Sequence, residues 1–214
     1  MDLLLAFNLN LKTPSNDTIE EIENFIISKE FVKHFGNYHD GGWESLGLIT
    51  SGGNPSEDRE IKGKKFEKTI FLKRDLKKLD LYIDSIPLKK KRVRIMKLKK
   101  GRKIFTHFDR TETFDLESMR IHVPIITNPK AVIKIINKEY HWEKGQVYYA
   151  DFSFPHSVEN NRDNDRYHLV IDCEISKHQK ELFPKEYLKQ KFKRSILKFF
   201  YQNYFKINKK LQLD

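Results

Sequence analysis

Five short segments between residues 93 and 174 constrain the fold of this chain most strongly. They are rich in β-branched and aromatic residues, and turn-forming sequences such as Thr127-Asn128-Pro129 separate them. Residues two apart lie on the same face of a strand, so such segments can bury one side each. Many short strands at this spacing predict a closed barrel or a double-sheet β core. The predicted strands cover residues 93–98, 119–126, 131–136, 146–151 and 167–174.

Helical periodicity marks both ends of this β region. Asp17 can accept backbone N–H bonds at a helix start, and apolar residues then recur at helical spacing through residues 19–26. A second helix is expected at about residues 74–86, and a third near Pro184, because proline suits a first helical turn. The predicted fold class is therefore mainly β, with flanking α-helices at both ends.

The chain is strongly basic, with 41 basic residues against 30 acidic ones and a net charge of +11. This excess favours acidic partners such as nucleic acid, anionic lipid, an acidic carrier protein or an anionic substrate. Neither a zinc-finger spacing nor an RNA-binding aromatic signature accompanies it, so no nucleic-acid partner is expected. The plainer interpretation is a solvated lysine-rich surface. The basic residues concentrate at residues 89–94, 97–103 and 185–210.

Cysteine content and hydropathy indicate the compartment. Cys173 is the only cysteine, which excludes an internal disulfide and fits a reducing environment. The apolar run at residues 3–7 is too short to span a membrane and has no basic leader. We therefore expect a cytoplasmic protein with no membrane span.

The strongest local pattern is Thr106-His107-Phe108-Asp109. On a strand, His107 and Asp109 would share a face and could reach one point together. A third ligand, for which His156 is the obvious candidate, would complete the two-histidine, one-carboxylate set of non-haem iron(II) oxygenases. Alone, a His-x-Asp pair is more often a surface feature. The competing histidines are His34, His39, His122, His141, His168 and His178.

The sequence around this pattern resembles the aspartyl/asparaginyl β-hydroxylase family, which includes bacterial hydroxylases of free amino acids such as proline. The resemblance covers roughly residues 40–173, because Gly42-Trp43-Glu44-Ser45-Leu46 and Thr69 also fit. Seven motifs in order are more specific than any one of them. They are residues 94–98, 107–109, 120–125, 127–128, 145–151, 155–160 and 166–172.

This resemblance implies a double-stranded β-helix, that is, a cupin-like jelly roll, over residues 1–183 with its N-terminal helices. Residues 184–214 would form a basic, aromatic C-terminal helix, packed on this domain or appended to it. The resemblance also implies an Fe(II) enzyme with 2-oxoglutarate and O2 as co-substrates, its catalytic metal ligands being His107, Asp109 and His156. Some family members lack the carboxylate ligand, so the retained Asp109 favours hydroxylation over halogenation.

Three further residues are predicted to bind the co-substrate. Arg166 matches the family's arginine for the distal carboxylate of 2-oxoglutarate, and a guanidinium is the best bidentate partner for that group. Arg120 and His122 match residues that line the co-substrate site. His122 is expected to donate a hydrogen bond rather than to bind the metal. The alternative for Arg120 is a substrate carboxylate, and the sequence leaves both open.

The leading functional hypothesis is a dioxygenase that hydroxylates an unactivated C–H bond of an amino acid, free or in a small peptide or carrier-bound intermediate. The alternatives are a protein aspartyl/asparaginyl hydroxylase, a lipid acyl hydroxylase and a non-catalytic metal-binding cupin. A zinc hydrolase is disfavoured, because no His-Glu-x-x-His helix is present. The C-terminal helix could bind an acidic carrier protein or a membrane surface. The favoured interpretation is that it packs against its own barrel.

Overall fold

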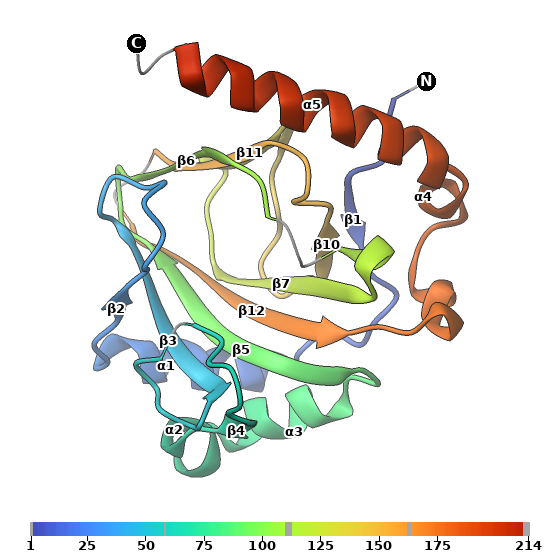
Figure 1. Cartoon of the computed structure of the whole chain (residues 1–214). Coiled ribbons are helices and arrows are strands. Elements are labelled where there is room, and N and C mark those ends of the chain that lie inside the picture. Colours follow the sequence, from blue (N-terminus) through green and yellow to red (C-terminus); the bar gives the residue numbers. More distant parts are fainter. Residues whose placement is uncertain (1, 58, 110–112, 162–163, 212–214) are drawn as a thin grey trace.

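The computed structural model describes residues 2–57, 59–109, 113–161 and 164–211, and within its helices the side chains of residues 177, 178 and 208–211 are excluded. Its strands form two antiparallel sheets (Figure 1). The larger sheet has the order β1-β10-β7-β12-β5-β3-β2, with β4 paired to β3. Its strands are β1 (Ala6–Asn8), β2 (Val32–Lys33), β3 (Trp43–Ser51), β4 (Phe66–Lys68), β5 (Lys89–Leu98), β7 (Ser118–Ile126), β10 (Tyr148–Ala150) and β12 (Arg166–Glu174).

The smaller sheet has the order β6-β11-β8-β9 and faces the larger one (Figure 1). Its strands are β6 (Lys103–His107), β8 (Ala131–Ile135), β9 (Lys138–Tyr140) and β11 (His156–Asn160). Leu98 of the larger sheet packs in one apolar cluster with Ile104 and Ile135 of the smaller sheet. Two antiparallel sheets with a shared interior are the cupin-like, double-stranded β-helix arrangement, so the predicted fold class is confirmed.

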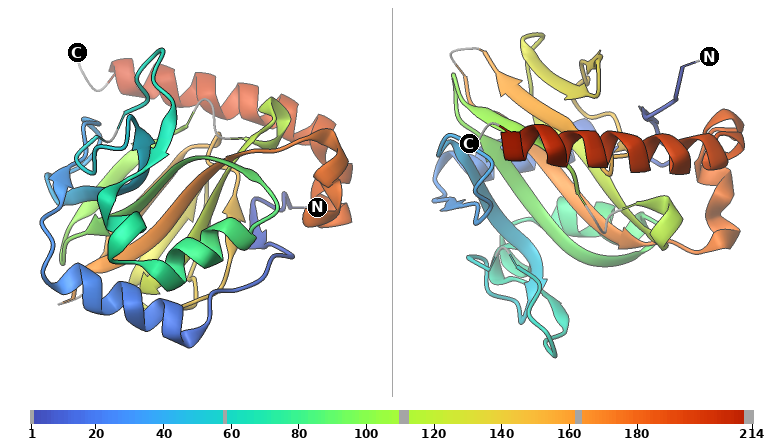
Figure 2. Two further views of the ribbon diagram at one scale, coloured as in Figure 1. Left: turned by 90° about the horizontal axis from the view of Figure 1, so that it is seen from below. Right: turned by 45° about the horizontal axis from the view of Figure 1, so that its top comes forward.

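Three helices cover the outer face of the larger sheet (Figure 2, left). They are α1 (Asn16–Ile27), α2 (Ile70–Arg74) and α3 (Lys77–Ser85). Ile22 of α1 and Ile83 of α3 are fully buried in one core with Val93 and Ile171 of the sheet. Burial of each large aliphatic side chain contributes about 1.5–3 kcal/mol to the stability of the fold. This helical layer therefore stabilises the strands that carry the site.

Several predicted boundaries shift in the structure. Ser15, not Asp17, caps α1, because its side chain accepts the Thr18 N–H. The helix predicted at residues 74–86 begins only at Lys77, because α2 ends just before it. The five predicted strands correspond to β5, β7, β8, β10 and β12.

The C-terminal region forms two helices rather than one. Pro184 is the N-cap of α4 (Lys185–Lys189), and α5 (Lys191–Leu211) follows after Gln190. A short 3-10 turn, η2 (Lys177–Leu182), precedes them, and another, η1 (Phe114–Leu116), precedes β7. The last three residues of the predicted segment 184–214 lie outside the described residues.

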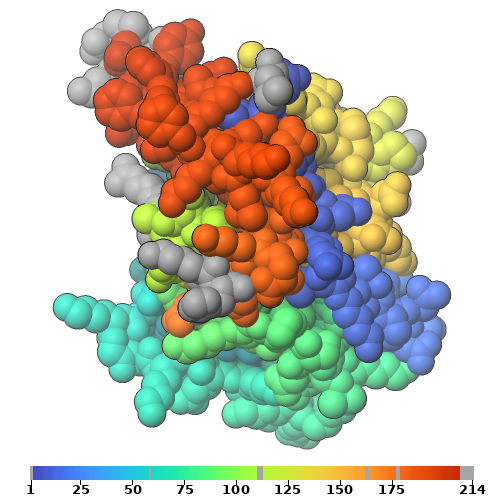
Figure 3. All heavy atoms as spheres, turned by 90° about the vertical axis from the view of Figure 1, so that its right-hand side faces the viewer, coloured from blue at the N-terminus to red at the C-terminus, as the bar shows by residue number. Residues whose placement is uncertain are grey.

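α5 lies across the molecule beside the smaller sheet and the N-terminal residues (Figures 1 and 3). Gln190 joins these parts, since it accepts the Leu4 N–H at 2.9 Å through its side-chain oxygen. Farther along α5, the Gln202 amide donates to the Ser153 carbonyl at 2.7 Å, and Tyr201 contacts Phe154. None of the helices in the described ranges is both long and apolar enough to cross a bilayer.

Candidate metal and co-substrate site

His107, Asp109 and His156 converge on one point between the two sheets. His107 ends β6 and His156 begins β11, and the antiparallel register places the two residues opposite each other. Each of the three residues offers one ligand atom, and these atoms all lie within 4.8 Å of one another. The cluster is therefore compact enough for a single metal ion.

Asp109 reaches this point by a different route from the predicted one. β6 ends at His107, so Asp109 does not share a strand face with it. Instead, the Asp109 backbone N–H donates to the Phe152 carbonyl at 2.8 Å, which fixes the chain just after the strand. The expectation of two ligands on one strand is therefore wrong, although the side chains still meet.

Backbone hydrogen bonds orient both imidazoles. The His107 Nδ1 lies 2.8 Å from the Phe105 carbonyl, and the His156 Nδ1 lies 3.0 Å from the Phe154 carbonyl. A carbonyl can only accept, so Nδ1 carries the hydrogen in each ring and Nε2 presents its lone pair. Burial lowers the pKa of both rings, that of His156 well below its ordinary value. Both histidines are thus neutral and have the tautomer that metal binding requires.

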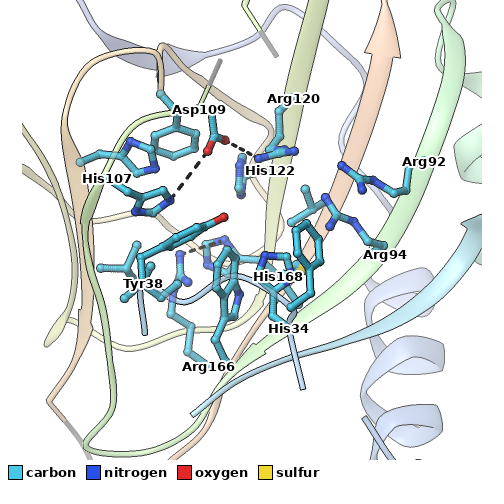
Figure 4. A pocket seen from close by; sticks show the side chains of 18 residues that line it. His34, Tyr38, Arg92, Arg94, His107, Asp109, Arg120, His122, Arg166 and His168 are labelled. Atoms are coloured by element: carbon cyan, nitrogen blue, oxygen red, sulfur yellow. Dashed lines mark hydrogen bonds and ion pairs between the residues drawn. The ribbon is translucent and has the colours of Figure 1, made fainter. Parts of the chain in front are cut away.

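Arg120 holds the second oxygen of Asp109. Its Nη1 donates to Asp109 Oδ2 (Figure 4), and its Nε donates to Asp172 Oδ1 at 2.6 Å. Asp109 Oδ1 faces His107 Nε2 at 3.7 Å, so this oxygen is turned toward the other ligand atoms. The pairing of β7 with β12 brings Arg120 opposite Asp172, so the sheet register builds this contact.

Asp172 is the centre of a buried charge cluster. Arg92 and Arg94 also donate to its carboxylate, at 3.0 and 3.1 Å. Burial alone would raise the pKa of Asp172, but Arg120, Arg94 and Arg92 outweigh it and hold that pKa well below its usual range. Asp172 is therefore ionised and anchors the arginine that in turn holds Asp109.

The three converging side chains line a cavity of about 220 Å³, with walls from both sheets (Figure 4). Arg166, the first residue of β12, also lines it and is buried. Its Nη2 donates to His168 Nδ1 at 3.1 Å, and no carboxylate of the described residues pairs with it. Burial lowers the pKa of Arg166 to about 9. An uncompensated buried cation is costly, so the site suits an anionic ligand.

His122 lies in the same wall; the residue as a whole is half-buried, but both of its ring nitrogens are shielded from solvent. Its ring stands 5.3 Å from that of Trp142 and 5.2 Å from that of Phe152. Neither ring nitrogen has a hydrogen-bond partner among the described residues, and the same holds for His168 Nε2. Buried polar atoms without partners are rare in native proteins. Their presence together in one cavity indicates a polar ligand.

The family model described as aspartyl/asparaginyl beta-hydroxylase matches residues 13–175, well over half of the chain. The chain belongs to the aspartyl/asparaginyl β-hydroxylase family. As a member, it is an Fe(II)- and 2-oxoglutarate-dependent hydroxylase, which confirms the family, the enzyme class and the cofactors predicted from the sequence.

Solved structures that resemble this hydroxylase do so distantly. A 2OG-Fe(II) oxygenase family oxidoreductase from Burkholderia pseudomallei is 13% identical with a TM-score of 0.47, over 75% of this chain and 79% of that one. HygX from Streptomyces hygroscopicus, with nickel and 2-oxoglutarate bound, is 9% identical with a TM-score of 0.46, over 76% and 80%. The viral collagen prolyl hydroxylase vCPH from Paramecium Bursaria Chlorella virus-1 is 10% identical with a TM-score of 0.44, over 79% and 95%.

The donor set of this hydroxylase suits ferrous iron. Two imidazole nitrogens and one carboxylate oxygen form the facial set that leaves positions open for a co-substrate and oxygen. Each histidine also makes the outer hydrogen bond that metal-binding imidazoles need, and Arg120 supplies the same support to the carboxylate. The residues present thus fit the metal that the family uses.

Sequence reasoning assigned no role to two residues of the hydroxylase site. His168 was considered only as a competing ligand, although it stands two residues after Arg166 on β12, and this spacing places both on one face. Tyr38 stacks on His107 with ring centroids 4.0 Å apart. It comes from an irregular segment far upstream, so no local pattern marks it. His39 and His141 do not line the cavity, and the side chain of His178 lies outside the described residues.

Proposed function

We propose that this hydroxylase binds Fe(II) through His107, Asp109 and His156 and hydroxylates a small amino acid, free, in a short peptide or on a carrier. The proposal rests on the convergence of these three ligand atoms within 4.8 Å of one another at the wall of a cavity. The same cavity contains the buried Arg166, with which no carboxylate of the described residues pairs. Bound Fe(II) supplies the activation of O2 that inserts one oxygen atom into a C–H bond while 2-oxoglutarate is oxidised to succinate and carbon dioxide.

Arg166 would bind the distal carboxylate of 2-oxoglutarate. Its guanidinium presents a fork of donors, and only His168 Nδ1 occupies one of them among the described residues. Because Nδ1 of His168 accepts that bond, its Nε2 carries the hydrogen and can donate to a ligand. His122 offers another donor in the same wall. Together these groups would hold a dicarboxylate with its keto-acid end toward the metal.

Arg120 would position Asp109 rather than bind a ligand directly. The sequence leaves a co-substrate and a substrate carboxylate open for this residue, but its contacts with Asp109 and Asp172 support a third role. By holding Oδ2, Arg120 leaves only Oδ1 of Asp109 turned toward His107. It would thereby keep the carboxylate monodentate and the remaining metal positions open.

The cavity dimensions support a small substrate. About 220 Å³ is below the roughly 300–1,000 Å³ typical of pockets for drug-sized ligands. Arg92 and Arg94 line the cavity together with Tyr38, so guanidinium groups lie within reach of a substrate carboxylate. These charged groups in the cavity wall disfavour a lipid acyl chain as the substrate.

The test is a turnover assay with Fe(II), ascorbate and 2-oxoglutarate against a panel of amino acids and short peptides. We expect substrate-dependent succinate formation together with a product that is heavier by one oxygen atom. Iron-dependent succinate formation without an oxygenated product would agree with the enzyme class but contradict the proposed substrate class. Absence of iron-dependent succinate across the panel would support the non-catalytic cupin instead.

A further inference from the structure

α5 carries apolar side chains on two opposite sides, and only one of them is covered. On the inner side Arg194 is fully buried, and Leu197 and Tyr201 pack against the smaller apolar cluster. The outer side is a row that we call the outer stripe. The outer stripe consists of Phe192, Ile196, Phe199, Phe200 and Ile207.

The outer stripe is unusually exposed for its composition. Phe192 is 78% exposed and Phe199 is 65% exposed. At 3.6 residues per turn, the five side chains lie within roughly 100° around the helix axis, opposite Arg194. They extend over roughly 22 Å of helix, which runs along the outside of the molecule (Figures 1 and 2, right). A contiguous apolar row of this kind marks an interaction surface.

Most of the chain's net positive charge lies on α5 and the short helix α4 that precedes it. Residues 185–211 contain nine basic residues against Glu186 alone, which gives +8 of the total +11. Lys191, Lys193 and Lys206 are exposed, and at 100° per residue they flank the outer stripe on its two sides. The segment lies outside the part of the chain that the family model matches.

We propose that α5 binds an anionic phospholipid bilayer, lying flat on it with the outer stripe at headgroup depth. A helix with aromatic and aliphatic residues on one face, bordered by lysines, is the typical interfacial helix. The flanking lysines would lie near the lipid phosphates, where each basic residue adds to the attraction. This inference does not depend on the proposed substrate.

Other occupants fit the outer stripe less well. A second copy would bring two +8 segments together, and like charges at that density repel. An acidic carrier protein would be complementary in charge, but the outer stripe is a convex row on an exposed helix and not a groove that could receive a protein segment. A bilayer surface accepts a convex apolar row and supplies the negative charge as well.

The first test measures binding of the full chain to sedimenting vesicles of phosphatidylcholine, with and without phosphatidylglycerol. We expect binding only to the anionic vesicles, and weaker binding as salt screens the charges. The double variant Phe192→Ser/Phe199→Ser should bind at least about tenfold more weakly, since two large apolar anchors are lost. The matched control is Ile27→Ser/Leu81→Ser, which removes side chains that are 82% and 73% exposed elsewhere. This control should bind like the unaltered protein.

A second pair of variants isolates the charge. Lys191→Glu/Lys193→Glu should lower binding to anionic vesicles by more than about tenfold. Lys62→Glu/Lys65→Glu changes the net charge equally but at exposed positions outside α5, and it should have a much smaller effect. Circular dichroism and thermal melting check that all four variants remain folded.

Several results would overturn the proposal. One is the absence of binding to anionic vesicles, and another is equal loss of binding in the outer-stripe variant and its control. A dimer in light scattering that Phe192→Ser/Phe199→Ser dissociates would assign the outer stripe to a second copy. Binding of an acidic acyl carrier protein through the same residues, with vesicles left unbound, would assign it to a protein partner.

Discussion

Two arginines of the site, Arg120 and Arg166, make contacts that indicate different roles. Arg120 bridges Asp109 and Asp172, two carboxylates, whereas Arg166 contacts a neutral imidazole and no carboxylate of the described residues. One guanidinium is therefore satisfied by the protein and the other is left for a ligand. This difference gives two separable predictions.

Replacing Arg120 should weaken the metal site. Arg120→Met leaves Asp109 without its partner, and we expect Fe(II) affinity to fall by roughly 10–100-fold, the usual cost of removing an outer-shell contact. KM for 2-oxoglutarate at saturating iron should change little. Arg120→Lys should restore part of the affinity, because an ammonium group can still reach one carboxylate. A raised KM with unchanged iron affinity would instead favour the co-substrate role predicted from the sequence.

Replacing Arg166 should give the opposite pattern. Arg166→Lys keeps a positive charge but loses the bidentate fork, so KM for 2-oxoglutarate should rise roughly tenfold or more while Fe(II) affinity is retained. Arg74→Lys, at an exposed position, serves as the matched control. If KM stays at the value of the unaltered enzyme, Arg166 does not bind the co-substrate.

At the scale of elements, the strands show what alternation can and cannot predict. β5 and β12 were predicted because β-branched and apolar residues recur along them. Alternation does not predict β3, because residues 45–51 are buried on both faces, as happens in a strand that is covered on each side. The off-strand position of Asp109 could not be read from the sequence, since the end of β6 depends on its pairing with β11.

The attachment of α5 also depends on contacts distant in sequence. Arg194 is fully buried, its guanidinium lies 3.5 Å from the centre of the Tyr187 ring, and its Nε lies 3.6 Å from Asp151. Tyr187 in turn donates to Asp151 at 3.2 Å. These buried partners join the C-terminal helices to the loop that follows β10, two residues before Ser153.

Removing this buried cation should destabilise the fold. Arg194→Leu leaves Asp151 without its cation, and breaking such a pair costs about 3–5 kcal/mol. Chemical denaturation should show a loss of this size in the free energy of unfolding. Lys189→Leu, at the exposed last residue of α4, should change it by less than about 0.5 kcal/mol. Equal stability of the two variants would mean that Arg194 contributes little to the docking of α5.

Across the whole molecule, the sequence predicted the metal-binding and co-substrate-binding residues better than the residues that hold them in position. The three converging side chains and Arg166 were predicted from ordered motifs, and they line one cavity between the sheets. The contact of Arg120 with Asp172 was not foreseen, because it requires the exact register of β7 against β12. The exposed face of α5 could not be distinguished from its packed face either, since both are apolar in sequence.

One cavity is expected to hold both iron and 2-oxoglutarate through these residues. A crystal structure grown without oxygen in the presence of Fe(II) and 2-oxoglutarate, with anomalous data at the iron edge, tests it most directly. We predict an iron peak in contact with His107 Nε2, Asp109 and His156 Nε2, and the distal carboxylate of 2-oxoglutarate on Arg166. Iron bound elsewhere, or a co-substrate carboxylate turned away from Arg166, would contradict this account.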